Sequence, residues 1–189
     1  MTSAPGKIRV IGGRWRNSRI EVPEFPGLRP TTERVRETLF NWLMPVIEGA
    51  RCLDLCAGTG ALGIEALSRG AASTQFVEPH ARVAQALRDN LTRLKLPGGD
   101  VSTADASAFL HTAPRSFDVA FLDPPFALNL WSVLADLLEQ GHWLAPAAWI
   151  YVEYPTGQLP SLPSTWRLHR EGRAGEVGYG LFRRQASRA

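Results

Sequence analysis

The chain has 189 residues, of which 44% are hydrophobic and 21% are charged, a balance typical of one globular domain with a substantial core. Its only two cysteines, Cys52 and Cys56, and its four scattered histidines exclude a disulfide scaffold and predict no metal site. No apolar run reaches the length of a membrane span and no signal-peptide core is visible, so we expect a cytoplasmic protein.

The net charge of +3 is unevenly distributed. Residues 1–36 carry a net +5, residues 37–165 a net −6 and residues 166–189 a net +4. Basic ends around an acidic middle favour a polyanion, here nucleic acid, held at one edge of the fold, although charged termini can also simply keep a protein in solution.

Residues 7–22 form the first basic segment. Two β-rich pieces flank turn residues, which predicts a hairpin that turns at Asn17-Ser18 and bends at Gly12-Gly13, or the reverse. Guanidinium groups bind phosphates and an exposed indole can stack on a base, while packing of the indole against the main domain is an equal alternative. The side chains expected to line this hairpin are Lys7, Arg9, Arg14, Trp15, Arg16 and Arg19. We divide the chain into a hairpin extension with its linker, residues 1–30, and a main domain, residues 31–189.

A helix is predicted after the Pro/Gly-rich linker, capped by Thr31 or Thr32. Its apolar stripe consists of Val35, Leu39, Trp42, Leu43 and Val46. Three more basic residues, Arg29, Arg34 and Arg36, lie near the start of this helix. Arg34 and Arg36 fall off the apolar stripe, so we expect them to be free to meet phosphates or carboxylates.

A nucleotide-type module follows. Residues 51–55 predict a buried strand, and Gly58-x-Gly60-x-x-Gly63 leads from it into a helix that ends near Arg69. Glycines at this spacing let the backbone approach a ligand closely. A second strand ends at Glu78, twenty positions after Gly58, where a carboxylate can accept hydrogen bonds from a ribose diol. A solvent-exposed strand end is the alternative for Glu78.

Both NAD and S-adenosylmethionine carry a ribose, so Glu78 does not separate these cofactors. Asp54, just before the glycine loop, would repel the pyrophosphate of a dinucleotide, whereas S-adenosylmethionine has no phosphate and carries a sulfonium and an amino group. The residues therefore favour S-adenosylmethionine. Asp105, which follows a third strand at residues 100–104, can bind an adenine amino group or cap the helix expected at residues 106–113.

The fourth strand, residues 117–122, ends at Asp123-Pro124-Pro125-Phe126. A central strand cannot continue through two prolines, so the motif lies at the carboxyl end of a strand, where open α/β sheets bind ligands. The carboxylate of Asp123 and the carbonyl of Pro124 offer two acceptors for an exocyclic NH2, and the ring of Phe126 offers a surface for stacking. A tight turn without a ligand is the alternative.

The remaining pattern continues the alternation of helix and strand. Helices are expected at residues 81–94 and 129–139, the second with Leu130, Val133, Leu134, Leu137 and Leu138 facing inward. A fifth strand, residues 149–152, ends at Glu153; residues 155–165 are irregular; and a closing hairpin pairs residues 166–170 with residues 177–183. Alternating strands and helices predict an α/β fold with a doubly wound, mostly parallel sheet of seven strands.

The chain resembles the class I S-adenosylmethionine-dependent methyltransferases, Rossmann-like proteins whose strand order is 3-2-1-4-5-7-6 with strand 7 antiparallel. An aspartate, two prolines and an aromatic residue mark the branch that methylates exocyclic amines of bases. Residues 9–16, 28–43 and 53–63 are similar to the RsmD family, bacterial 16S ribosomal RNA guanine-N2 methyltransferases. Cys56 stands where that family often has phenylalanine, and the C-terminal hairpin matches it less sharply.

This resemblance implies methyl transfer to a guanine of 16S ribosomal RNA, in an assembled or partly assembled small subunit, by a monomer without a metal or a membrane anchor. The catalytic residues it implies are Asp123, Pro124, Pro125 and Phe126. The cofactor-binding residues it implies are Thr32, Asp54, Ala57, Gly58, Gly60, Glu78, Asp105, Ala106 and Asp123. RNA contacts would come from the hairpin side chains named above and from Arg29, Arg34 and Arg36.

Three alternatives remain open from the sequence. A DNA adenine-N6 or cytosine-N4 methyltransferase shares the aspartate motif, but 189 residues leave little room for a target-recognition domain. An NAD-linked oxidoreductase fits the glycine loop but gives residues 123–126 no purpose. A non-enzymatic RNA-binding assembly module fits the basic ends and predicts RNA binding without methyl transfer.

Overall fold

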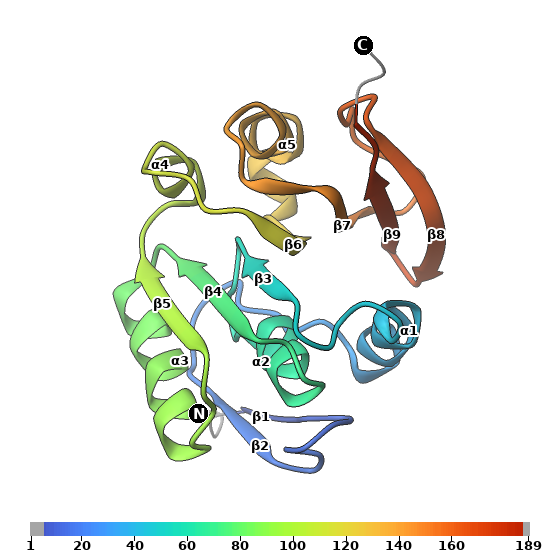
Figure 1. Cartoon of the computed structure of the whole chain (residues 1–189). Coiled ribbons are helices and arrows are strands. Elements are labelled where there is room, and N and C mark those ends of the chain that lie inside the picture. The colour runs from blue at the N-terminus through green and yellow to red at the C-terminus, as the bar shows by residue number, and fades with distance from the viewer. Residues whose placement is uncertain (1–5, 187–189) are drawn as a thin grey trace.

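The main sheet of the computed structural model, which describes residues 6–186, has seven strands in the order β5-β4-β3-β6-β7-β9-β8 (Figure 1). Its strands are β3 (Arg51–Asp54), β4 (Ser73–Glu78), β5 (Gly99–Thr103), β6 (Phe117–Leu122), β7 (Leu144–Pro155), β8 (Trp166–Ala174) and β9 (Val177–Arg184). Strands β3 to β7 pair in parallel, and β9 is antiparallel to both of its neighbours. The predicted order 3-2-1-4-5-7-6, with the last strand antiparallel, is confirmed.

Helices cover both faces of this sheet. They are α1 (Glu33–Leu43), α2 (Ala61–Ser68), α3 (Ala81–Arg93), α4 (Ala106–Leu110) and α5 (Trp131–Gln140), with a 3-10 turn η1 at Phe126–Leu128. Figure 1 shows α1, α2 and α3 on one face and α4 and α5 on the other, so the domain has three layers. Among residues 6–186, no helix is both long and apolar enough to cross a membrane.

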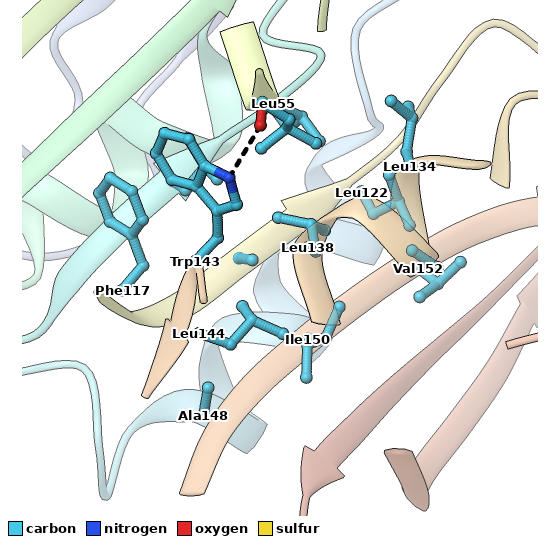
Figure 2. Close-up of a cluster of buried hydrophobic side chains, with 14 of the residues drawn as sticks. Leu55, Phe117, Leu122, Leu134, Leu138, Trp143, Leu144, Ala148, Ile150 and Val152 are labelled. Carbon is cyan, nitrogen blue, oxygen red and sulfur yellow. Dashed lines mark hydrogen bonds between the residues drawn. The ribbon is translucent and has the colours of Figure 1, made fainter. Parts of the chain in front are cut away.

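The central strand β6 is buried on both faces, as its apolar run predicts. Val119 and Phe121 belong to the cluster that contains α1, whereas Phe117, Ala120 and Leu122 belong to the cluster that contains α4 and α5. In the second cluster the ring of Trp143 stacks on Phe117, with 6.3 Å between centroids, and its Nε1–H donates to the carbonyl of Leu110 at 3.2 Å (Figure 2). Both faces of the strand before the Asp123 motif are therefore filled by side chains.

Helix α5 differs from its prediction. It begins at Trp131 rather than at residue 129, because the 3-10 turn ends at Asn129 in the left-handed conformation, with φ 48°. Trp131 is buried and donates its indole N–H to the carbonyl of Glu153 at 2.8 Å. Val133, predicted to face inward, is 53% exposed because the buried face is centred on Trp131, Leu134 and Leu138. Helix α4 ends at Leu110, three residues before its predicted end.

The predicted N-terminal hairpin is present as β1 (Gly6–Arg9) and β2 (Arg19–Val22), an antiparallel pair. Its connection is longer than the predicted two-residue turn, since the N–H of Asn17 and the carbonyl of Ser18 both bond to the backbone of Val10, and residues 11–16 form the loop between them. Ile8, Val10 and Ile20 share a hydrophobic cluster with α2, α3 and β4. The hairpin therefore packs directly on the main domain.

Candidate cofactor and substrate site

Five neighbouring strands bring a carboxyl group to the same edge of the sheet. Glu78 ends β4 and Asp54 ends β3, while Asp105 and Asp123 follow β5 and β6, and Glu153 lies near the end of β7. The order β5-β4-β3-β6-β7 and the parallel pairing place these five residues in one row, which we call the acidic row. The edge is the one at which open α/β sheets bind ligands.

The glycine loop is held onto the acidic row by its own amides. The N–H of Gly58 donates to Oε2 of Glu78 at 3.0 Å, and the N–H of Ala57 donates to the carbonyl of Val77 at 2.9 Å. Gly60 has φ 79°, and a Cβ there would lie 2.3 Å from Cδ1 of Leu87. Glu78 is buried, which rules out the alternative of a solvent-exposed strand end. Glycine is required at position 60 by both conformation and space.

Asp54 lies beneath this loop and ties the strand to the helix that follows. Its Oδ2 accepts the N–H of Gly63 at 3.0 Å. Burial raises the pKa of Asp54 to about 7, although the hydrogen bond from Gly63 acts in the opposite direction. This side chain therefore anchors the start of α2 at the centre of the acidic row.

The carboxyl groups of the acidic row fit S-adenosylmethionine. Acceptor oxygens line the row from β5 to β7, and its five members are all acidic; such a set suits an amino group, a sulfonium and a ribose diol and disfavours a pyrophosphate. Thr32 and Asp105 both serve as helix N-caps: Thr32 Oγ1 accepts from Val35 at 3.3 Å and Asp105 Oδ1 accepts from Ala108 at 3.1 Å. The helix cap, which was the alternative role for Asp105, is therefore present. Asp105 is also exposed and precedes Ala106, the first residue of α4, so its second carboxylate oxygen is left for a ligand.

The Asp123 motif follows β6 directly, and its two prolines end the strand as predicted. Burial raises the pKa of Asp123, and the neighbouring carboxyl of Glu153 raises it further. Pro124 is buried, whereas Phe126 is 37% exposed and begins the 3-10 turn, its ring centroid 5.7 Å from that of Trp131. A carboxyl oxygen, a rigid carbonyl and an accessible aromatic ring thus lie within four consecutive residues.

The sequence pattern assigned no role to Glu153, and the structure places it beside Asp123. Oε2 of Glu153 accepts the hydroxyl of Tyr151 at 3.0 Å and the hydroxyl of Thr31 at 3.3 Å. Burial raises the pKa of Glu153, and the two hydroxyl donors oppose that rise. One signal was available in the sequence: Glu153 follows its strand just as Asp123 follows the neighbouring strand.

The prediction that Arg36 is free to meet RNA is wrong. Arg36 is 1% exposed and forms a buried ion pair with Glu65, 3.4 Å apart, while the same guanidinium donates to the carbonyls of Arg9 and Thr31. Glu65 also accepts the backbone N–H groups of Ile11 and Gly12. Arg36 met a carboxylate, but it fastens the hairpin to the domain.

The other basic candidates are exposed; they are Lys7, Arg9, Arg14, Arg16, Arg19, Arg29 and Arg34. Arg9 pairs with Glu33 at 2.8 Å on the surface. Trp15 packs against the main domain, which was the second of its two predicted roles. Its indole N–H donates to the carbonyl of Leu94 at 2.8 Å, and its ring packs against the hydrophobic cluster that contains Ile8 and Ile20. The Arg14 guanidinium lies 5.0 Å from the centroid of this ring. The hairpin thus presents guanidinium groups on its surface and uses its indole for docking.

Cys52 is a buried free thiol and Cys56 a half-buried one, and burial raises the pKa of both. Within residues 6–186, no cluster of three or more histidine, cysteine, aspartate or glutamate side chains is arranged to hold a metal ion.

Comparison with known proteins agrees with this geometry. The family described as "Conserved hypothetical protein 95" matches residues 8–183. The chain is 50% identical to ribosomal RNA small subunit methyltransferase D of Escherichia coli K12, over 97% of this chain and 93% of that protein, and 44% identical to the protein of the same name in Haemophilus influenzae, over 95% of each.

Solved structures give the same result. The Escherichia coli protein yhhF superposes with a TM-score of 0.90 at 47% identity, covering 96% of this chain and all of that one. An RNA methyltransferase of Salinibacter ruber, solved with S-adenosyl-L-homocysteine, shares the fold at a TM-score of 0.66 and 16% identity, covering 85% of this chain and 97% of that one. The chain therefore belongs to the RsmD family of methyltransferases.

Proposed function

We propose that the protein transfers a methyl group from S-adenosylmethionine to the exocyclic N2 amine of a guanine in 16S ribosomal RNA of the small ribosomal subunit. The observation that carries this proposal is the position of Asp123 and Pro124, at the carboxyl end of the central strand and beside the glycine loop. The names of the relatives support ribosomal RNA of the small subunit as the substrate. Guanine N2 as the target rests on the family resemblance.

The residues of the site would act mainly by positioning the amine. S-adenosylmethionine supplies, when bound, a methyl group on a positively charged sulfur. The lone pair of a guanine amine is delocalised into the ring, so the amine is a poor nucleophile. Hydrogen bonds from its two hydrogens to the Asp123 carboxyl and the Pro124 carbonyl favour the tetrahedral nitrogen of the transition state. The nitrogen attacks in line, without a covalent enzyme intermediate, and its proton then leaves to Asp123 or to water.

The target base must leave its stack to reach this carboxyl group. Extrusion costs a few kcal/mol, less in a loop of the RNA than in a duplex. The exposed ring of Phe126 can recover about 1–3 kcal/mol of this cost by stacking on the base. Pro124 and Pro125 restrict the backbone, so the Asp123 carboxyl, the Pro124 carbonyl and the Phe126 ring keep fixed relative positions.

The exposed cations of the hairpin and linker would bind the RNA backbone. Arg14 and Arg16 lie in the hairpin loop, and Arg29 and Arg34 flank the start of α1. Guanidinium groups pair well with phosphates and make the affinity depend on salt. Arg36 is no longer part of this proposed surface. We infer a monomer that acts in the cytoplasm on an assembled or partly assembled small subunit.

The test uses small subunits from cells that lack their own enzyme for this site. Purified protein is incubated with these subunits and methyl-labelled S-adenosylmethionine, and the RNA is digested to nucleosides. Label should appear in N2-methylguanosine, and Asp123→Ala should reduce the rate of its formation about 10²–10³-fold, as expected for loss of one transition-state partner. Label in N6-methyladenosine or N4-methylcytidine would instead support the amine methyltransferases of other bases.

A matched control lies on the same strand. Asp118 is near the amino end of β6 and pairs with Arg51 at 3.0 Å, far along the strand from the motif. Asp118→Ala removes a carboxylate of β6 from a surface ion pair, so the rate of this variant should remain close to that of the unchanged protein. Near-normal turnover in Asp123→Ala would contradict the acceptor role.

A further inference from the structure

Glu153 is a buried carboxyl group in direct contact with the catalytic motif. Strands β6 and β7 pair in parallel with Leu122 opposite Val152, so the next residues, Asp123 and Glu153, lie side by side at the edge of the sheet. This register brings the two carboxyl groups close enough for each to shift the pKa of the other. Glu153 is itself held by the hydroxyls of Tyr151 and Thr31, and its backbone carbonyl accepts from Trp131.

Two neighbouring buried carboxyl groups favour a state with one proton between them, because two like charges repel and an ionised carboxylate can only accept a hydrogen bond. The donors around the pair decide where that proton lies. Both hydroxyls reach Oε2 of Glu153, which favours the carboxylate form of Glu153 and leaves the proton on Asp123. Two other titratable groups act on the pair: Asp54 on β3 through its charge on Asp123, and Tyr151 on β7 through its hydrogen bond to Glu153. In this arrangement the pair would carry one proton and one negative charge.

We propose that Glu153 is the positioning residue of Asp123 and the final acceptor of the proton that leaves the methylated amine. This inference deepens the proposed function and rests on it. The carbonyl oxygen of a protonated Asp123 would accept one hydrogen of the target amine while its O–H points to Glu153. The orientation of the catalytic carboxyl is thereby set by the neighbouring strand.

The proton step balances on this pair. When the N–C bond forms and the S–C bond breaks, the amine nitrogen acquires the positive charge that the sulfur loses. The nitrogen then gives its proton to the free oxygen of Asp123, and the proton already on Asp123 passes to Glu153. The negative pair becomes neutral, and its extra proton is later released to water. No oxidant, metal or further base is needed.

The test compares Glu153→Gln with the unchanged protein. Glutamine keeps the size of the side chain and can hydrogen-bond to Asp123, but it cannot take the proton. We expect the single-turnover rate of methyl transfer on small subunits to fall roughly 10- to 100-fold. The dissociation constant of S-adenosyl-L-homocysteine, measured by calorimetry, and the KM for subunits should each change less than about threefold. A merely structural role would instead impair binding and stability together.

A spectroscopic measurement tests the shared proton without using activity. The infrared band of the protonated carboxyl group, recorded at neutral pH, should shift in Glu153→Gln, because the O–H of Asp123 then donates to an amide oxygen instead of a carboxylate. Glu139→Gln is the matched control, since Glu139 is a half-buried carboxylate bound by Trp166 and Arg184 away from the acidic row. It should leave both the band and the rate unchanged.

A second variant keeps the proposal testable if Glu153→Gln fails to fold. Thr31→Val removes one hydroxyl donor from Glu153 and should slow methyl transfer several-fold at unchanged cofactor affinity. The role of Glu153 would be overturned if Glu153→Gln left both the rate and the carboxyl band unchanged. It would also be overturned if Thr31→Val left the rate unchanged. Absence of N2-methylguanosine with the unchanged protein would overturn the proposed function instead, and the infrared band would still decide whether the pair shares a proton.

Discussion

Replacing Glu65 with glutamine should unfasten the N-terminal hairpin from the main domain. The Glu65 carboxylate is fully buried and accepts the backbone N–H of Gly12 at 2.8 Å and of Ile11 at 3.0 Å. It also pairs with Arg69 at 2.9 Å and with the buried Arg36 at 3.4 Å. A glutamine amide keeps one acceptor oxygen and turns the other into a donor. At least one donor then lacks an acceptor, and the Arg36 charge loses its counter-charge.

The expected loss of folding stability is large because the Glu65 and Arg36 side chains are buried away from water. Removing one partner of a buried ion pair costs about 3–5 kcal/mol, since the other charge remains buried and unpaired. This is a large part of the 5–15 kcal/mol that typically stabilises a domain. For a chain of this length, about 2–4 °C per kcal/mol gives a fall in Tm of roughly 6–20 °C.

Two measurements check this prediction. Thermal unfolding followed by circular dichroism gives the change in Tm, and hydrogen exchange should accelerate at the amides of Ile11 and Gly12. The matched control is Glu33→Gln, which breaks the exposed pair with Arg9 and should cost about 1 kcal/mol or less. A Tm of Glu65→Gln within about 2 °C of that control, or unchanged exchange at both amides, would refute the reasoning.

Three further predictions concern the cofactor site and the RNA surface. Gly60→Ala should weaken S-adenosyl-L-homocysteine binding in calorimetry by tenfold or more, because φ is 79° and a Cβ there would clash with Leu87. Asp54→Asn should flatten the pH dependence of the unfolding free energy. Folding raises the pKa of Asp54 from 3.8 to about 7. The stability that this group contributes is therefore complete below pH 4 and is lost as the pH rises through 7. Arg14→Ala with Arg16→Ala should lower the salt slope of subunit binding by about 2.

Two of these predictions have a control of the same chemistry. Gly157 has φ 75° with open space around it, so Gly157→Ala carries the strain without the clash and should leave cofactor affinity unchanged. Arg167→Ala with Arg170→Ala removes two exposed cations from β8, at the far edge of the sheet (Figure 1). An equal effect of the two arginine pairs on the salt slope would contradict the assignment of the RNA surface to the hairpin. Equal pH dependence in Asp54→Asn would contradict the raised pKa.

Local sequence determined the strands, their ends and the chemistry placed there. The apolar run of residues 117–122 can only be a buried strand, and Pro124 and Pro125 must end it because they lack the N–H groups of a ladder. In the same way, Gly60 marks a left-handed turn between strand and helix. The position of Asp123, Glu78 and the glycine loop at one edge follows from these local rules once the strands are parallel.

Contacts between distant segments were decided only by the tertiary structure. Helical periodicity shows that Arg36 lies off the apolar stripe of α1. It does not show that the hairpin covers that side of the helix or that Glu65 pairs with Arg36 there. The same holds for Trp15, which reaches Leu94, and for Glu153, whose neighbour Asp123 belongs to another strand. Periodicity describes one element at a time, whereas the burial and partners of a charged side chain depend on which other elements pack against it.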